Sequence, residues 1–174
     1  CIKSIIVLGG VHAIISPSDI INSNFDAFCI GEGEISLTNL MKKITNKESF
    51  YDTKGFWFKV DGRIIKNLPE QYVQDLDLLP GRDFDVMNTK EILLARNKWL
   101  SISFSRGCVY NCNFCINQYL NEVYKSACLK GKYFRRNSIS KIIKELTDIV
   151  EKYRKYIDII NFDDDLLMLD QNWI

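Results

Sequence analysis

Short apolar runs alternate with helical patterns in the first part of the chain. The runs Ile5–Leu8 and Ala27–Ile30 are continuously apolar, and each is followed by glycine. Pro17–Ile21 suits a short helix, and a longer one follows Gly31–Glu34, with apolar positions at Ile35, Leu37, Leu40, Met41 and Ile44. Fully apolar strands separated by helices predict a parallel sheet that is buried on both faces. Residues 1–50 are therefore predicted to be part of a doubly wound α/β domain.

A hairpin and an irregular connector are predicted for residues 51–95. The segments Gly55–Val60 and Arg63–Lys66 flank Asp61-Gly62, a pair that favours a two-residue hairpin turn. We interpret the hairpin as a small linker element. The segment Asn67–Asn88 that follows is predicted to be a loop without chemistry of its own.

Residues 96–174 show the pattern of a β/α barrel. Strands are predicted at Leu100–Phe104 and Ile157–Phe162, and a short helix at Asn117–Lys125. Ser138 is suited to cap a longer helix, whose apolar stripe is formed by Ile139, Ile142, Ile143, Leu146, Ile149, Val150 and Tyr153. One strand-helix-strand unit is thus predicted, and active groups in such barrels lie at the carboxyl ends of the strands.

Composition excludes several classes of function. The 174 residues carry a net charge of +1, which creates no field that would demand nucleic acid or anionic lipid as a partner. Five basic residues lie between positions 125 and 136 (Lys125, Lys130, Lys132, Arg135 and Arg136), but base-stacking motifs are missing, so we interpret them as a solvated loop. Apolar runs are too short to cross a bilayer, and the first residues lack a targeting pattern. Six cysteines without a secretory segment predict a cytoplasmic protein.

Three cysteines form the most informative motif, C-x₃-C-x₂-C, at Cys108, Cys112 and Cys115. Three thiolates bind a four-iron cluster and leave one iron open to a substrate or cofactor. A structural zinc site is the alternative, although zinc usually takes four ligands from paired C-x₂-C units. Cys128 could supply a fourth ligand, which would make the protein an iron-sulfur electron carrier. Cys1, Cys29 and Cys128 otherwise suit small buried positions.

The segment Ser103–Cys115 resembles the cluster loop of the radical S-adenosylmethionine (SAM) enzymes. The resemblance implies that SAM chelates the open iron of a 4Fe-4S cluster and is cleaved to methionine and a 5′-deoxyadenosyl radical. It also implies that Phe114 lies near the adenine of SAM. The protein itself would supply placement and electrostatics.

A second segment, Phe162–Leu167, resembles the F-x-D-D-x-F sequence of cobalamin-type radical SAM proteins, with Leu167 in place of the usual aromatic. The resemblance implies that Asp164 or Asp165 accepts a hydrogen bond from the ammonium group of SAM, which a carboxylate suits chemically. A helix-capping or solvated role is the alternative.

Two glycine loops resemble the end of the cobalamin-binding domain that precedes many radical SAM barrels. They are Gly9-Gly10, and the four residues Gly31, Glu32, Gly33 and Glu34. The resemblance implies that both loops border the nucleotide tail of cobalamin. Ordinary strand-to-helix turns with capping glutamates are the alternative. His12 lacks the sequence context of a cobalt-ligating histidine, so we expect a loop contact or a solvent-facing side chain.

These features together predict an interior fragment of a cobalamin-dependent radical SAM enzyme, comprising the C-terminal part of a Rossmann-like cobalamin-binding domain (1–50), a hairpin and linker (51–95) and the start of a partial (β/α)6 barrel (96–174). By resemblance, the reaction is methyl transfer to an unactivated carbon or a phosphinate, with cyclisation or rearrangement as the alternative. A non-catalytic cobalamin-binding or zinc-stabilised module is a further alternative. The expected partners are a small-molecule substrate and a low-potential electron donor such as flavodoxin or ferredoxin. We expect the fragment alone to be inactive, because an incomplete barrel exposes a sheet edge.

Overall fold

The computed structural model describes residues 4–167, which form two compact units. The first unit contains the described residues up to Val73 together with Asn111–Gly131, and the second contains Gln74–Tyr110 and the described residues from Lys132 onward. The units therefore group the chain differently from the three consecutive parts expected from sequence. Assignment of those parts to a cobalamin-binding domain, a linker and a barrel stays a prediction.

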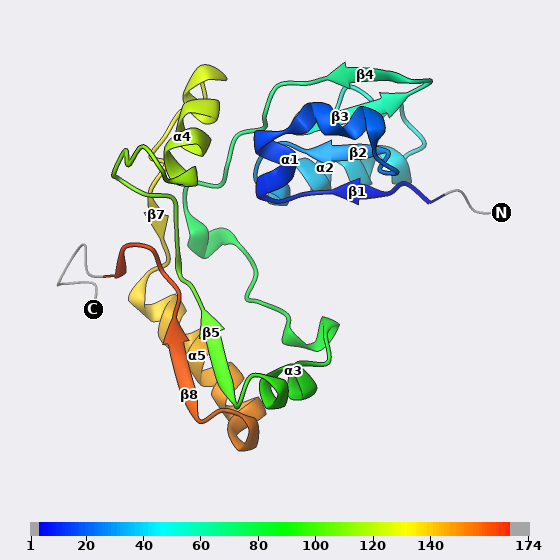
Figure 1. The fold of residues 1–174 in the computed structure, drawn as a ribbon. Helices are drawn as coiled ribbons and strands as arrows, with labels where there is room; N and C mark the ends of the chain where they lie inside the picture. The colour runs from blue at the N-terminus through cyan, green and yellow to red at the C-terminus, as the bar shows by residue number, and fades with distance from the viewer. Residues whose placement is uncertain (1–3, 168–174) are drawn as a thin grey trace. The chain divides into compact units, whose positions relative to one another are not determined.

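A four-stranded sheet organises the first unit (Figure 1). Its strands lie in the order β1 (Val7–Leu8), β2 (Ala27–Cys29), β3 (Phe56–Val60) and β4 (Arg63–Lys66). Its helices are α1 (Val11–Ile15), the 3-10 helix η1 (Pro17–Asn22), α2 (Gly33–Thr45) and α4 (Ile116–Ser126). Helix α1 was not predicted, and the helix predicted at 17–21 is a 3-10 helix.

The sheet is mixed rather than wholly parallel. Strands β1 and β2 are parallel, with Leu8 opposite Phe28, as predicted. Strand β3 runs antiparallel to β2, with Cys29 opposite Phe56, and pairs with β4 in the predicted hairpin. The hairpin therefore extends the sheet, because its first strand pairs with the free edge of β2.

Strand β2 is buried on both of its faces, as its continuously apolar sequence predicted, whereas the edge strand β4 is largely exposed. Ala27, Cys29 and Phe58 pack with Leu40 of α2 on one face. On the other face, Phe28 and Ile30 pack with Ala13 of α1 and Ile20 of η1. Consecutive β2 residues thus contact opposite layers, as the alternation of side chains along a strand requires.

Gly55 occupies a position that no larger residue fits. Its φ is +81°, and an added Cβ would lie 2.1 Å from the Oγ atom and 2.7 Å from the Cβ atom of buried Ser36. Gly62 in the hairpin turn has φ +73° but has no atom within 4 Å of an added Cβ. We expect Gly55→Ala to lower the free energy of unfolding by about 3 kcal/mol, and Gly62→Ala by only about 1 kcal/mol. Urea denaturation measures both, and equal losses would show that Ser36 moves aside without cost.

The second unit contains the strand-helix-strand element predicted for a β/α barrel. Its elements are the 3-10 helices η2 (Leu76–Leu78) and η3 (Phe84–Val86), α3 (Thr89–Ala95), β5 (Trp99–Ile102), β6 (Ser105–Arg106), β7 (Arg135–Arg136), α5 (Ile139–Tyr153), η4 (Arg154–Tyr156) and β8 (Ile159–Phe162). Strands β5 and β8 are parallel, with Leu100 opposite Ile160 and Ile102 opposite Phe162 (Figure 1). Strands β6 and β7 form a short antiparallel pair.

Helix α5 covers this parallel pair with much of its predicted stripe. Ile142 and Ile149 are buried against β5, and Leu146, Val150 and Tyr153 pack beside them. The predicted Ser138 cap is confirmed, because its Oγ accepts a hydrogen bond from the Lys141 N–H at 3.2 Å. Ile139 and Ile143 were wrongly placed in the stripe: both are exposed, since they lie at its flank.

Asp77 of η2 anchors the start of α5. Its Oδ1 accepts hydrogen bonds from the Ser138 N–H at 2.9 Å and from Asn137 Nδ2 at 3.1 Å. The hydrogen bond with Ser138 lowers the pKa of the Asp77 carboxyl below its usual value. A lowered folded-state pKa contributes stability above the unfolded pKa, near 4, and this stability is lost as the pH falls through the folded pKa.

We therefore expect Asp77→Asn to lower the melting temperature by about 2 °C at pH 7. The difference from wild type should shrink below about pH 4. Thermal unfolding followed by circular dichroism over this pH range measures it, and a difference that is constant with pH would contradict the electrostatic cause.

Over residues 4–167, the structure contains no helix with the length and apolar composition needed to cross a membrane.

Candidate functional site

The cysteine loop begins at a turn that requires glycine. Gly107 follows β6 with φ +78°, and an added Cβ would lie 2.4 Å from the carbonyl oxygen of Tyr133. No side chain fits there, because the obstructing atom belongs to the backbone. The loop ends at Cys115, which occupies the N-cap position of α4.

The loop presents thiols of differing exposure. Cys112 is exposed, and Cys108 and Cys115 are half-buried. The Cys115 N–H donates to the Cys112 carbonyl at 2.9 Å, and the Tyr110 N–H lies 3.4 Å from Cys108 Sγ as a donor. Asn117 Nδ2 lies 3.9 Å from Cys115 Sγ. Where thiolates bind an iron-sulfur cluster, backbone and amide N–H groups that donate to the sulfur atoms tune the properties of the cluster.

All five described cysteines are free thiols, so the donor set is soft and suits iron-sulfur ligation. Within residues 4–167, no three His, Cys, Asp or Glu side chains lie close enough together to hold a metal ion. Cys108 belongs to the second unit, and Cys112 and Cys115 belong to the first. Assignment of the three cysteines as cluster ligands stays a prediction.

Cys128 lies at the opposite end of α4 from Cys115. It follows the helix in a left-handed conformation, with φ +55°. The 11-residue helix α4, which lies between the two residues, is about 16 Å long. One cluster requires all its ligands in a single small coordination sphere, so this helix argues against Cys128 as the fourth ligand.

Phe114 is 94% exposed, which is unusual for a large aromatic side chain. It lies between two cysteines of the loop and belongs to neither hydrophobic cluster of the first unit. An exposed aromatic ring beside candidate ligands suits stacking against a planar group. Its contact with adenine stays a prediction.

The carboxyl end of β8 distinguishes the two candidate aspartates. Asp164 Oδ1 accepts hydrogen bonds from the N–H of Phe104 at 2.8 Å and of Ser105 at 2.6 Å, and also from the Ser105 hydroxyl. Asp165 is exposed. Asp164 is therefore fixed against the segment that leads into the cysteine loop, and sequence alone did not separate the two residues.

The second carboxylate oxygen of Asp164, Oδ2, is buried and has no hydrogen-bond partner among the described residues. A buried acceptor without a donor costs about 1–3 kcal/mol. A cationic donor such as an ammonium group would remove this cost and gain a charge-assisted hydrogen bond. This carboxylate oxygen fits the role that the family resemblance implies.

The two glycine loops occupy the same edge of the first unit, because β1 and β2 are parallel. Gly9 leads into Gly10, which has φ +88° and starts α1, while Gly31 and Glu32 lead into α2. Gly33 and Glu34 form the first turn of α2. The carboxyl edge of a parallel pair is where open α/β sheets bind ligands.

The remaining features of this edge are His12 and a groove. His12 Nε2 lies 3.2 Å from Asp19 Oδ2, and its side chain is 59% exposed, in accord with the expected solvent-facing position. A groove of about 350 Å³ is lined mainly by apolar residues, among them Ile14, Ile30, Trp57 and Val123. Sequence analysis missed the groove, since Val123 and Tyr119 come to it from α4, far along the chain.

No family model matches this chain. A relative named as an uncharacterized methyltransferase, from Pyrococcus horikoshii, is 26% identical over 168 residues, which are 95% of this chain and 34% of that protein. The anaerobic magnesium-protoporphyrin IX monomethyl ester cyclase of Synechocystis is 32% identical over 114 residues, which are 64% of this chain and 23% of the cyclase. The chain thus spans about a third or less of the length of these relatives.

Several solved structures share the fold. The cobalamin-dependent S-adenosylmethionine radical enzyme OxsB, with aqua-cobalamin bound, aligns with a TM-score of 0.70 and 24% identity over 94% of this chain and 21% of OxsB. The radical S-adenosylmethionine methyltransferase TsrM from Kitasatospora setae aligns with a TM-score of 0.62 and 16% identity, over 91% of this chain and 29% of TsrM. The chain is therefore similar in sequence to proteins named as a methyltransferase and a cyclase, and it shares its fold with solved cobalamin-dependent and radical S-adenosylmethionine enzymes.

Proposed function

We propose that this chain belongs to a cobalamin-dependent radical SAM enzyme that transfers a methyl group to an unactivated carbon or a phosphinate. One observation carries the proposal: three free thiols share one loop, and the next cysteine along the sequence, Cys128, lies beyond the far end of α4. A site with three thiolates leaves an open iron position for a cofactor.

In this proposal, Cys108, Cys112 and Cys115 hold a 4Fe-4S cluster. When bound, the reduced cluster supplies the electron that cleaves SAM. Asp164 holds the ammonium group of SAM through Oδ2, while its Oδ1 stays bonded to the Phe104 and Ser105 amides. The exposed ring of Phe114 stacks on the adenine. Asp165 is exposed and serves at most as an outer polar contact.

Cobalamin is proposed to lie at the carboxyl edge of β1 and β2. Gly9, Gly10 and Gly31 lack side chains and let the backbone approach a large ligand, and Glu32, Gly33 and Glu34 begin the adjacent helix. The apolar groove beside Ile30 and Trp57 offers burial for a flat, largely apolar group. His12 is not assigned as a cobalt ligand, because it is bonded to Asp19.

Cyclisation is the second candidate reaction. It is favoured by the 32% identity with a protein named as a protoporphyrin ester cyclase, which exceeds the 26% identity with the methyltransferase. Methyl transfer is preferred because the methyltransferase aligns over 95% of the chain and the cyclase over 64%. Both candidates take a small-molecule substrate and need a low-potential electron donor such as ferredoxin or flavodoxin.

Anaerobic reconstitution of the full protein with iron and sulfide tests the proposal. We expect about four irons for each chain, iron-sulfur absorption, and an electron paramagnetic resonance (EPR) signal that changes when SAM is added. A separate titration with hydroxocobalamin should show saturable binding by its visible absorption. Zinc in place of iron, or a cluster whose spectrum ignores SAM, would overturn the proposal.

A further inference from the structure

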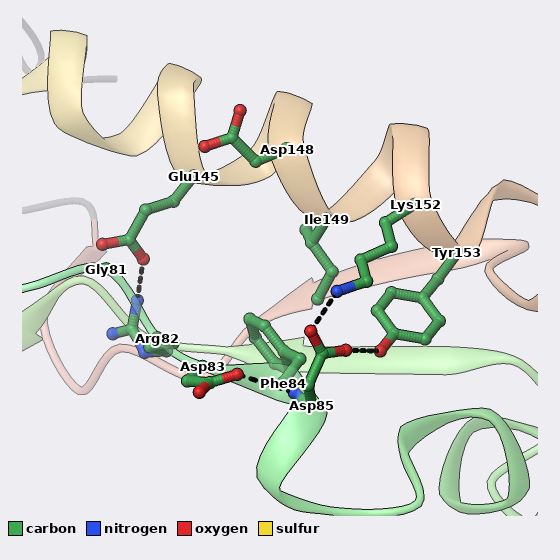
Figure 2. Close-up of a pocket in the computed structure, with 10 residues that line it drawn as sticks. All are labelled: Gly81, Arg82, Asp83, Phe84, Asp85, Glu145, Asp148, Ile149, Lys152 and Tyr153. Carbon is green, nitrogen blue, oxygen red and sulfur yellow. Dashed lines mark hydrogen bonds and ion pairs between the residues drawn. The ribbon is translucent and has the colours of Figure 1, made fainter.

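Figure 2 shows two of the places at which the connector before β5 contacts α5. Arg82 Nη1 lies 2.6 Å from Glu145 Oε2. Further along the helix, Asp85 binds Lys152 and accepts a hydrogen bond from the Tyr153 hydroxyl at 2.9 Å. Both ion pairs join the same connector to the same helix, so the Asp85–Lys152 pair serves as a control for the Arg82–Glu145 pair.

Arg82 also holds the end of β5. Its Nη2 donates a hydrogen bond to the carbonyl oxygen of Ser103, directly after the strand. Its guanidinium carbon lies 4.9 Å from the centroid of the Phe104 ring, within the range of a cation–π contact. Among the described residues, the hydrogen bonds of the Asp85 side chain go to Lys152 and Tyr153 and do not involve Ser103 or Phe104.

The ion pair of Arg82 is more protected than an ordinary surface pair. The Glu145 side chain is only 11% exposed, although that of Arg82 is 40% exposed. Lys141 Nζ lies 3.9 Å from Glu145 Oε1, so Lys141 balances the charge of the Glu145 carboxylate less well than Arg82 does. A largely buried carboxylate with a close, directed partner resists the screening that makes exposed pairs weak.

The same strand end positions the candidate SAM carboxylate. Phe104 and Ser105 donate their amides to Asp164 Oδ1, and this leaves the buried Oδ2 free to accept a donor. A continuous set of contacts thus runs from Glu145 through Arg82 and the Ser103-Phe104 backbone to Asp164. Any displacement of this backbone changes where Oδ2 lies.

We infer that Arg82 is a positioning residue for the SAM site, acting through the Ser103–Ser105 backbone on Asp164. The inference rests on the proposed function, because it assigns Asp164 to the ammonium of SAM. Arginine suits the position, since its planar fork donates in two directions and its face stacks on the Phe104 ring. A lysine would keep the charge toward Glu145 but would lose the planar fork and its stacking.

The variants Arg82→Gln, Arg82→Lys and the matched control Lys152→Gln test the inference. Hydrogen–deuterium exchange of the peptide that contains Phe104 and Ser105, in the cluster-free full protein, measures how strongly the backbone after β5 is protected from local opening. Titration of SAM against the EPR signal of the reconstituted cluster reports its dissociation constant. We expect Arg82→Gln to speed exchange of these amides and to raise the dissociation constant about ten-fold, because the backbone that holds Asp164 loses its contact with the guanidinium group. Arg82→Lys should fall between Arg82→Gln and wild type.

Lys152→Gln should lose one ion pair between the connector and α5 while leaving both measurements at wild-type values. The inference is overturned if Arg82→Gln leaves SAM affinity unchanged in a wild type that does bind SAM, or if Lys152→Gln matches its effect. A wild type that binds no SAM would overturn the proposed function itself. Should Arg82→Gln fail to fold, Arg82→Lys alone decides between these outcomes.

Discussion

Replacing Cys112 with alanine is expected to abolish the iron-sulfur cluster. Cys112 is the exposed, central member of the three-cysteine loop, and the loop contains no fourth cysteine that could take its place. Two thiolates do not hold a four-iron cluster, so the reconstituted variant should contain less than about a tenth of the wild-type iron. Iron analysis and visible absorption of protein handled without oxygen measure the loss.

Cys128→Ala is the matched control for this prediction. Cys128 is also exposed and also has a free thiol, but about 16 Å of helix separates it from Cys115. The control should keep the full iron content and the EPR response to SAM. Loss of the cluster in Cys128→Ala would instead favour a four-cysteine electron carrier, and iron retained in Cys112→Ala would contradict the three-thiolate site.

Sequence predicted the elements whose signals are local. The apolar spacing of Ile142, Leu146 and Ile149 and the capping hydroxyl of Ser138 determine α5 within one short segment. The Asp61-Gly62 pair likewise determines the β3–β4 hairpin, because both residues have positive φ, as such a turn requires. These features are set by neighbouring residues and need no knowledge of the rest of the fold.

Sequence did not predict the features that depend on contacts between distant segments. The hairpin pattern does not say that β3 pairs with β2, since strand pairing is a choice among free edges. The sequence of α4 is amphipathic, but it does not indicate which segment the helix packs against. In the structure, Tyr124 of α4 packs against Tyr72, with ring centroids 4.9 Å apart. Tertiary packing decides both outcomes.

The choice between Asp164 and Asp165 shows the same limit at the site. Adjacent residues at the end of a strand point in different directions. Because Asp163, Asp164 and Asp165 are all aspartate, the sequence does not show which side chain points toward the site. Only the parallel pairing of β8 with β5 brings one of the three carboxylates to the Phe104 and Ser105 amides. The assignment of Asp164 to the SAM ammonium thus depends on the register between β5 and β8, which cannot be predicted from the local sequence.

Replacing Asp164 with asparagine is expected to weaken SAM binding by about 10- to 100-fold while the fold survives. The asparagine oxygen still accepts the amides of Phe104 and Ser105 that Asp164 Oδ1 now accepts. At the position of Oδ2, however, an NH₂ donor would face the ammonium of SAM, and a charge-assisted hydrogen bond of about 1.5–3 kcal/mol would be lost. Titration of SAM against the EPR signal of the reconstituted cluster measures the change.

Asp163→Asn is the matched control, because it changes the charge of a neighbouring residue that is exposed and bonded to Asn161. This variant should bind SAM within about two-fold of wild type, since exposed charges are screened by solvent and salt. Equal losses in both variants would show that the acidic segment acts only through its overall charge. An Asp164→Asn variant that keeps its iron and its melting temperature but binds SAM weakly places the effect at the carboxylate oxygen itself.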